Sequence, residues 1–298
     1  MVDGFVAFSN ETIPSLGIAN LLHEGKEEYN NMWQKSRSIW AYIYDHYLDD
    51  YDYFHLGGDD MYVLVENLRL FLEQVQNDQL IVDDPTIGVE NLSEGDNLRN
   101  LNRKQQPLFL GQWVGQPLNN PSTEDPLANN HTYMVSGGPG YTLNAVAVKR
   151  LVEDALPKCH VNDKVAYEDK LISKCFRQLG IVGHDTRDAT SGEQRYHDTN
   201  PAHLYSSQAS SSRRGSYHSR LAYYWEGLKH PNPKALGDEL SLSDVAVGPK
   251  NQLESVAPYS VSFHDLYNPI YAARVHAIVH RDVCPNDTPL GRALRLGE

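Results

Sequence analysis

Cysteine is scarce in this chain of 298 residues, which contains only Cys159, Cys175 and Cys284. Three cysteines are too few for a disulfide-rich scaffold, and their spacing does not match a zinc site. One pair can form a disulfide bond and leave the third cysteine free, and the spacing does not say which pair. Hydrophobic residues make up 40% of the chain, which is ordinary for a globular protein and excludes global disorder.

Long apolar runs and an excess of positive charge are also missing. No run approaches the ~18 apolar residues that a membrane-spanning helix needs. Residues 1–9 have neither the basic flank nor the apolar core of a signal peptide. Acidic residues outnumber basic ones by 39 to 26, which gives a net charge of −13. Because such a charge repels polyanions, the composition argues against nucleic acid as a partner.

Strand and helix patterns alternate along the chain, and this alternation predicts an α/β fold with its site at the carboxyl ends of strands. Aromatic or alternating segments predict strands, and apolar residues at steps of three and four predict helices. The predicted strands are 51–56, 107–111, 133–136 and 261–264, and the predicted helices are 24–47, 62–75, one starting near 144, 167–179 and 271–279. Residues 84–106 and 115–132 have the composition of loops, and 206–219 form a serine-rich stretch.

Two aspartates follow the strand that ends at Leu56. The sequence there reads Gly57-Gly58-Asp59-Asp60. Two carboxylates on a tight turn can offer oxygen atoms to a hard divalent ion, which would sit beside a diphosphate. The alternative is an acidic turn whose aspartates cap the next helix.

Glu168 and Asp169 form a second acidic pair, in the first turn of a predicted helix. One of them can serve as a general base if it faces a cleft. The simpler explanation is stabilisation of the helix dipole, which contributes roughly 0.3–1 kcal/mol.

Other candidates are weaker when taken singly. The loop at residues 136–140, Ser-Gly-Gly-Pro-Gly, lacks the lysine of a P-loop and the spacing of a dinucleotide fingerprint. Its glycines permit close approach to a ligand or simply make a turn. His264 follows an alternating strand and is either a metal ligand or a core histidine. Trp225, beside Tyr223 and Tyr224, is either a platform for a sugar ring or part of the core.

Together these motifs resemble the core 1 β1,3-galactosyltransferase branch of the Fringe-related glycosyltransferases. The most specific segment runs from Tyr51 to Arg69 and resembles the family's aromatic strand, acidic triplet and following helix. Residues 133–141, 167–169, 185–188 and 262–264 match further family motifs in the same order. The resemblance extends from residue 3 to about residue 279.

The resemblance implies a GT-A-type nucleotide-diphosphosugar transferase, an α/β fold around a central twisted mixed sheet. Residues 1–280 would form a single glycosyltransferase domain, truncated at its start by about one strand–helix unit. Residues 281–298 would form a C-terminal tail. The implied cofactor is Mn²⁺, and the implied partners are a UDP-sugar donor and a glycoprotein or glycopeptide acceptor, with a homodimer also allowed.

The family pattern assigns roles residue by residue. The implied metal ligands are Asp60, Asp59 and His264; the implied catalytic residues are Asp169, expected as the base, and Glu168. The implied donor-binding residues are Gly137, Gly138 and Asp59; the implied acceptor-binding residues are Trp225 and Tyr224; Cys159 and Cys175 match a pair that is bridged in relatives. The implied location is the Golgi lumen, as a type II membrane protein, although this chain shows neither an anchor nor a signal.

Several positions depart from the family pattern. Gly58 replaces the first aspartate of the acidic triplet, Leu56 a frequent lysine and Met61 a threonine. The cysteine pair that relatives carry before the late histidine is absent here. Two alternatives therefore stand beside galactosyl transfer: a Fringe-like transfer of another UDP-sugar, and a catalytically silent relative that acts as a chaperone.

Overall fold

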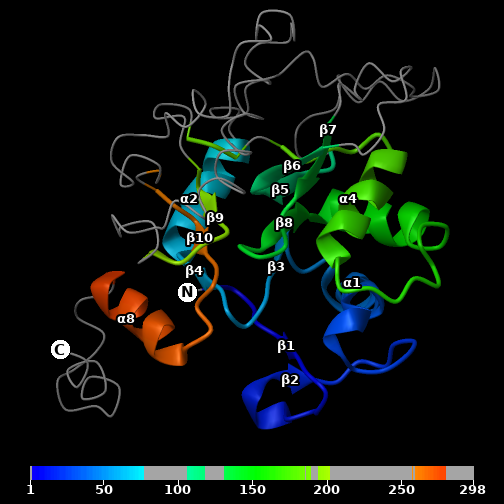
Figure 1. Cartoon of the computed structure of the whole chain (residues 1–298), viewed down its shortest axis with the longest axis horizontal. Helices are drawn as coiled ribbons and strands as arrows, with labels where there is room; N and C mark the ends of the chain where they lie inside the picture. Colours follow the sequence, from blue (N-terminus) through cyan, green and yellow to red (C-terminus); the bar gives the residue numbers. More distant parts are fainter. Residues whose placement is uncertain are drawn as a thin grey trace, which may run out of the picture.

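The structure is a computed structural model, and it describes residues 2–76, 106–117, 131–184, 186–188, 194–201, 257 and 259–279. Helices and strands are mixed along these segments, which confirms the predicted α/β character (Figure 1). The strands form four small sheets within the described residues. The GT-A fold itself stays a prediction, as does the single domain over residues 1–280.

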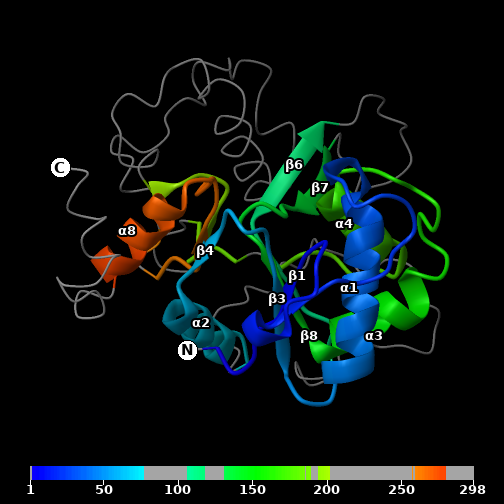
Figure 2. The same cartoon turned by 90° about the horizontal axis from the view of Figure 1, so that it is seen from below.

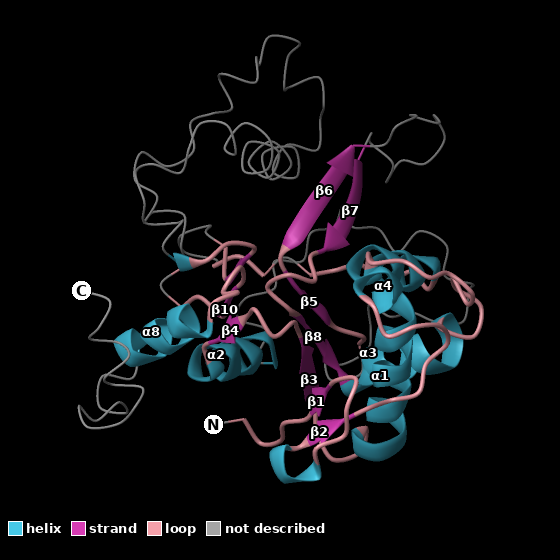
Figure 3. Ribbon diagram, turned by 60° about the horizontal axis from the view of Figure 1, so that its bottom comes forward, coloured by secondary structure: helices cyan, strands magenta, loops and turns pink. Residues whose placement is uncertain are grey.

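The sheet β3–β8–β5 lies at the centre of the described structure. It consists of β3 (Tyr53–Leu56), β8 (Tyr141–Asn144) and β5 (Phe109–Gly111), and every pairing in it is antiparallel. Figures 2 and 3 show α1 on one side of this sheet and α2 on the other. The predicted strands at 51–56 and 107–111 are thus confirmed with slightly shorter bounds.

Alternating side chains of these strands enter two separate cores. Phe54 and Phe109 pack in one core, whereas their neighbours Tyr53 and Leu110 pack in the other. This is the period-two alternation expected of a strand that is covered on both faces. The central sheet therefore separates the two cores.

The first core is built mainly by helices. These are α1 (Met32–Tyr47), α3 (Ala145–Arg150), which continues into the π-helical η5 (Leu151–Ala155), and α4 (Glu168–Gln178). Trp33, Leu151 and Phe176 are fully buried there. Burying a side chain of this size contributes roughly 1.5–3 kcal/mol, so this core anchors α4 and the acidic pair at its start.

Asn144 caps α3, the helix predicted to start near residue 144. Its side-chain oxygen accepts hydrogen bonds from Ala147 N–H, at 2.9 Å, and from Leu108 N–H, at 2.9 Å. Asparagine in this position satisfies a backbone donor that the first helical turn leaves free. The same side chain thus starts a helix and ties β8 to the segment before β5.

A second sheet carries the late part of the chain. In it, β10 (Ser262–Phe263) pairs antiparallel with β4 (Tyr62–Val63) and parallel with β9 (Tyr196–His197). Helix α2 (Val65–Gln76) packs beside it through Leu68, Phe71 and Val75, which lie at steps of three and four along one face. Helix α8 (Pro269–Val279) follows β10.

The remaining elements are small. Strands β1 (Ala7–Phe8) and β2 (Ile18–Ala19) pair in parallel, with the 3-10 helix η1 (Pro14–Leu16) between them. A second 3-10 helix, η2 (Tyr29–Asn31), precedes α1. Strands β6 (Trp113–Pro117) and β7 (His131–Val135) form a hairpin that projects from the central sheet in Figure 3.

Three expected boundaries were wrong. Helix α1 begins at Met32 rather than near residue 24, because the Asn31 side chain donates to the carbonyls of Glu24 and Lys26 and holds them in a loop. The second helix begins at Val65, because Tyr62 and Val63 pair with β10. Both ends of the predicted loop 115–132 belong to the β6–β7 hairpin.

No helix among the described residues has the length and apolar character needed to cross a bilayer.

Candidate active site

Asp60 and His264 lie side by side because of the β4–β10 pairing. Phe263 faces Tyr62 in this antiparallel pair, which leaves the two residues next to each other just beyond the paired positions. His264 Nε2 is 3.2 Å from Asp60 Oδ2, and Leu266 N–H donates to the Asp60 carbonyl at 2.9 Å. The structure thus brings together two residues that are 204 positions apart in the sequence (264 − 60).

Gly58 leaves room for the Asp60 carboxylate. A Cβ atom at position 58 would lie 2.7 Å from Asp60 Oδ1, a distance too short for nonbonded atoms. The carboxylate of Asp60 therefore occupies space that the side chain of the family's aspartate would need. The Asp59 side chain on the same turn is exposed.

Asp60 offers carboxylate oxygen atoms and His264 offers an imidazole nitrogen, and Mn²⁺ binds ligands of both kinds. Among the described segments, however, no group of three or more His, Cys, Asp or Glu side chains is arranged to hold a metal ion. The chemistry of the pair fits Mn²⁺, but the pair would fill only part of a coordination sphere.

The loop between β7 and β8 joins this pair to the second acidic pair. A Cβ atom at Gly137 would lie 2.8 Å from Glu168 Oε1, and one at Gly138 would lie 2.7 Å from His264 Nδ1. A side chain at either position would therefore require Glu168 or His264 to move. The two glycines place Glu168 and His264 on either side of one short loop.

The end of this loop is fixed by backbone geometry. Gly140 has a φ of +74°, in the left-handed region that favours glycine, and its N–H donates to the Gly137 carbonyl at 3.0 Å. Ser262 Oγ donates to the Pro139 carbonyl at 2.6 Å. The loop is thereby attached to β10, the strand that leads to His264.

Glu168 and Asp169 both reach toward the loop from the start of α4. Asp169 Oδ2 accepts the Gly137 N–H at 3.1 Å, and its Oδ1 accepts the N–H of Lys170 at 2.8 Å. Glu168 Oε2 accepts a hydrogen bond from the Tyr141 hydroxyl at 3.2 Å. Burial, together with the negative charge of Asp169, raises the pKa of Glu168 to about 8. A carboxyl that titrates near neutral pH is suited to proton transfer.

Asp198 is a neighbour of the site that sequence reasoning missed. It follows β9 directly and stands beside His264, because β9 and β10 are parallel and in register. Its Oδ1 accepts a hydrogen bond from Ser136 Oγ at 2.7 Å and would lie 2.8 Å from a Cβ at Gly138. The strand before it spans two residues, which is too short to give a recognisable pattern.

His55 also lies under the site and was not singled out from the sequence. Its Nδ1 is 2.9 Å from Thr142 Oγ1, and its Nε2 would be 2.6 Å from a Cβ at Gly140. Burial lowers its pKa to about 4, so the ring is neutral at neutral pH. The site therefore gains no positive charge from this histidine.

No family model matches the sequence. A glycoprotein-N-acetylgalactosamine 3-beta-galactosyltransferase 1 from Xenopus laevis is 22% identical over 278 residues, which cover 92% of this chain and 59% of the relative. The similarity supports the core 1 β1,3-galactosyltransferase branch. A chondroitin sulfate synthase 3 from Homo sapiens is 24% identical over 147 residues, 49% of this chain and 13% of that protein.

Both of these relatives are named as glycosyl-transferring or glycan-synthesising enzymes, and the similarity supports a glycosyltransferase. The chain spans 59% of the length of the Xenopus relative that it matches. The donor sugar, the acceptor and the metal requirement of this chain are therefore proposals.

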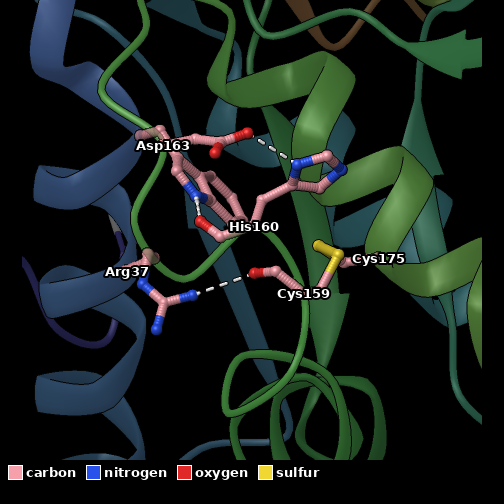
Figure 4. The surroundings of a disulfide bond; sticks show 6 residues. Arg37, Cys159, His160, Asp163 and Cys175 are labelled. Atoms are coloured by element: carbon pink, nitrogen blue, oxygen red, sulfur yellow. Dashed lines mark hydrogen bonds and ion pairs between the residues drawn. A yellow bond between two sulfur atoms is a disulfide. The ribbon is translucent and has the colours of Figure 1, made fainter.

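The disulfide implied by the galactosyltransferase resemblance is confirmed. Cys159 and Cys175 are bonded and buried, and they connect the segment after η5 to the third turn of α4 (Figure 4). Arg37 on α1 donates to the Cys159 carbonyl at 3.2 Å, and His160 Nδ1 is 2.7 Å from Asp163 Oδ2. The bond thus fixes α4, which carries the acidic pair at its first turn.

Some predicted residues lie outside the described part of the chain. These are the expected acceptor-binding residues Trp225 and Tyr224, together with Asp185 and Cys284. Their roles stay predictions.

Proposed function

We propose that this chain is an inverting, Mn²⁺-dependent β1,3-glycosyltransferase that moves galactose from UDP-galactose onto O-linked GalNAc of glycoproteins. The similarity to the Xenopus galactosyltransferase, whose name specifies transfer to N-acetylgalactosamine of glycoproteins, supports this sugar and this acceptor. The observation that carries the proposal is the loop at Gly137 and Gly138, which has Glu168 on one side and His264 on the other. A donor seated at this loop would have a metal-binding pair at its diphosphate and a carboxylate pair at its sugar.

On the donor side, Asp60 and His264 would hold the metal ion. A bound Mn²⁺ would neutralise negative charge on the diphosphate as the glycosidic bond breaks. The exposed Asp59 would help bind metal or nucleotide. The absence of side chains at Gly137 and Gly138 lets the backbone approach the donor sugar closely.

On the acceptor side, Asp169 would take the proton from the attacking hydroxyl. A sugar hydroxyl is a weak acid, so its attack is faster when a carboxylate removes the proton during the reaction. Attack on the face opposite to the leaving diphosphate inverts an α-linked donor to a β-linked product. Trp225 and Tyr224 are proposed to contact the acceptor on the strength of the family resemblance.

Two alternatives keep specific support. A Fringe-like transfer of another UDP-sugar would use the same groups, because sugar specificity depends on a few contacts. A silent relative is favoured by Gly58, which replaces one of the family's aspartates. We place catalysis first because both carboxylate pairs are retained, and because Glu168 and His264, the neighbour of Asp60, lie on either side of one loop.

Calorimetric titration with UDP, with and without Mn²⁺, tests the donor site. We expect binding that requires Mn²⁺ and that Asp60→Ala abolishes, whereas the control Asp45→Ala, at an exposed carboxylate on α1, leaves it unchanged. Undiminished Mn²⁺-dependent binding by Asp60→Ala would exclude Asp60 as a ligand. A wild-type chain that binds no UDP would favour the silent relative.

Transfer assays with GalNAc-peptides and a panel of UDP-sugars test the reaction. UDP-galactose is the expected donor, and another preferred UDP-sugar would favour the Fringe-like alternative. Asp169→Asn should lower kcat by about 10²–10⁴-fold with little effect on UDP binding. Full activity of Asp169→Asn would refute its role as the base.

We also propose that the protein works in an oxidising compartment of the secretory pathway, by resemblance the Golgi lumen as a type II membrane protein. The Cys159–Cys175 bond supports this location, because such bonds persist in oxidising compartments and are rare in the cytosol. Alkylation of the protein from its native source should leave both thiols unmodified until a reductant is added. A homodimer stays a proposal that light scattering can test.

A further inference from the structure

A chain of hydrogen bonds runs from the buried core to Glu168. The Trp40 indole N–H on α1 donates to the Tyr141 hydroxyl on β8 at 3.1 Å, and that hydroxyl donates to Glu168 Oε2 on α4 at 3.2 Å. Trp40 is 2% exposed and Tyr141 is 1% exposed. Three elements of the first core therefore meet at one tyrosine hydroxyl.

The chemistry of the three groups determines which of them donates in each hydrogen bond. An indole nitrogen can only donate a hydrogen bond, so the Tyr141 hydroxyl must accept from Trp40. The hydroxyl has one proton, which is then available for Glu168. Trp40 thus orients the Tyr141 hydroxyl as a donor toward the carboxyl group.

The other oxygen of Glu168 is directed at the glycine loop. Glu168 Oε1 lies 2.8 Å from the position that a Cβ of Gly137 would occupy, and Asp169 accepts the Gly137 N–H. With Oε2 held by Tyr141, Oε1 faces the place where the proposed donor sugar would lie. The contact with Tyr141 therefore sets the orientation of the whole carboxyl group.

Two opposing influences act on the proton affinity of Glu168. Burial and the neighbouring charge of Asp169 raise its pKa, whereas the hydrogen bond from Tyr141 lowers it. The start of α4 adds the positive end of a helix dipole, which also favours the charged form. Asp169 and Tyr141 are the titratable groups that face Glu168 from α4 and β8.

We propose that Tyr141, oriented by Trp40, is a positioning residue that holds the Glu168 carboxyl group against Gly137 and favours its charged form. This inference rests on the proposed function, in which the Glu168–Asp169 pair is the acid–base group. Because Glu168 and Asp169 are adjacent, a change in the charge of Glu168 also changes the electrostatic environment of the proposed base Asp169. Tyr141 thereby acts on the reaction without touching the substrate.

Carbon-13 NMR titration of the full chain, labelled at glutamate carboxyl carbons, tests the proposal without any need for activity. The resonance that Glu168→Gln removes is assigned to Glu168, and its midpoint in the wild type is expected at about pH 8. In Tyr141→Phe, the loss of a donor to the charged form should raise this midpoint by about one pH unit. Trp40→Phe should raise it in the same direction by less, because the hydroxyl remains but is no longer oriented.

The matched control is Tyr196→Phe. Tyr196 is equally buried on β9, and its hydroxyl lies 3.4 Å from Thr142 Oγ1 rather than near Glu168. The Glu168 midpoint should be unchanged in this variant. An unchanged midpoint in Tyr141→Phe, or an equal shift in Tyr196→Phe, overturns the proposal.

The dependence of kcat on pH then connects the contact to the reaction. Any limb of the wild-type profile that reports Glu168 should move to higher pH in Tyr141→Phe, by the same amount as the NMR midpoint. A lower kcat with an unchanged pH profile would mean that Tyr141 has a merely structural role, and it would overturn the claim that Tyr141 acts on the reaction. If the NMR midpoint shifts while no UDP-sugar is transferred even by the wild type, the positioning of Glu168 stands and the proposed function fails.

Discussion

Loss of the disulfide between Cys159 and Cys175 should destabilise the protein by an amount that follows from the length of the loop it closes. The two cysteines are separated by 16 positions. Closing a loop of this size in the unfolded chain contributes about 3 kcal/mol of stability. For a protein of this length, such a loss corresponds to a decrease in Tm of about 6–12 °C.

The double variant Cys159→Ala/Cys175→Ala measures this contribution, with unfolding in guanidinium chloride followed by tryptophan fluorescence. The third cysteine, Cys284, is replaced by serine in every protein compared, so that thiol exchange does not interfere. The reference protein should lose stability when dithiothreitol is added. The double variant should be insensitive to the reductant.

The double variant also removes two buried sulfur atoms, and this loss of packing must be separated from the loss of the bond. The difference between the reference protein with and without reductant reports the bond alone, because the sulfur atoms stay in place. If dithiothreitol reduces the bond, as alkylation would show, and the midpoint of unfolding stays the same, the loop-closure reasoning is refuted.

Three further predictions follow from single contacts. Gly138→Ala should weaken Mn²⁺-dependent UDP binding about tenfold in calorimetry, because overpacking beside His264 typically costs about 1–3 kcal/mol; unchanged affinity would mean that His264 moves freely. The stability of Glu168→Gln relative to the wild type, measured by urea unfolding, should be higher at pH 8.5 than at pH 5. The pKa of Glu168 is 4.5 in the unfolded chain and about 8 in the folded protein. The contribution of Glu168 to the free energy of unfolding is therefore complete below pH 4.5 and is lost as the pH rises to 8, by at most about 1.4 kcal/mol per pH unit. An equal stability difference at both pH values would contradict the raised pKa. Arg195→Met removes the guanidinium that lies 2.6 Å from Asp188 Oδ2, and a loss of about 3–5 kcal/mol is expected in urea unfolding; a near-neutral effect would show that the buried ion pair adds little.

Local patterns predicted the elements that carry the site. Glu168 and Asp169 start α4 as expected, and Asp60 follows the central strand β3. These predictions held because helix periodicity, a capping asparagine and glycine-bounded strands act over a few residues. The disulfide was expected only through the family resemblance, since the spacing of three cysteines left every pairing open.

Pairing between distant segments explains where sequence reasoning failed. Tyr62 and Val63 read as the start of a helix, but β10 takes them into a sheet, because pairing with a distant strand overrides local propensity. Asp198 was missed for a related reason, since the strand that positions it has two residues and depends on β10 for its place.

The sequence by itself determined the α/β character and the order of the acidic motifs. Only the tertiary structure decided that Asp60 meets His264, that Gly137 and Gly138 bridge the two acidic regions, and that Trp40 reaches Glu168 through Tyr141. The physical reason is the range of the interactions. Backbone propensity and capping act between near neighbours, whereas burial and strand pairing join residues that are far apart in the sequence, such as Trp40 with Tyr141 and Asp60 with His264.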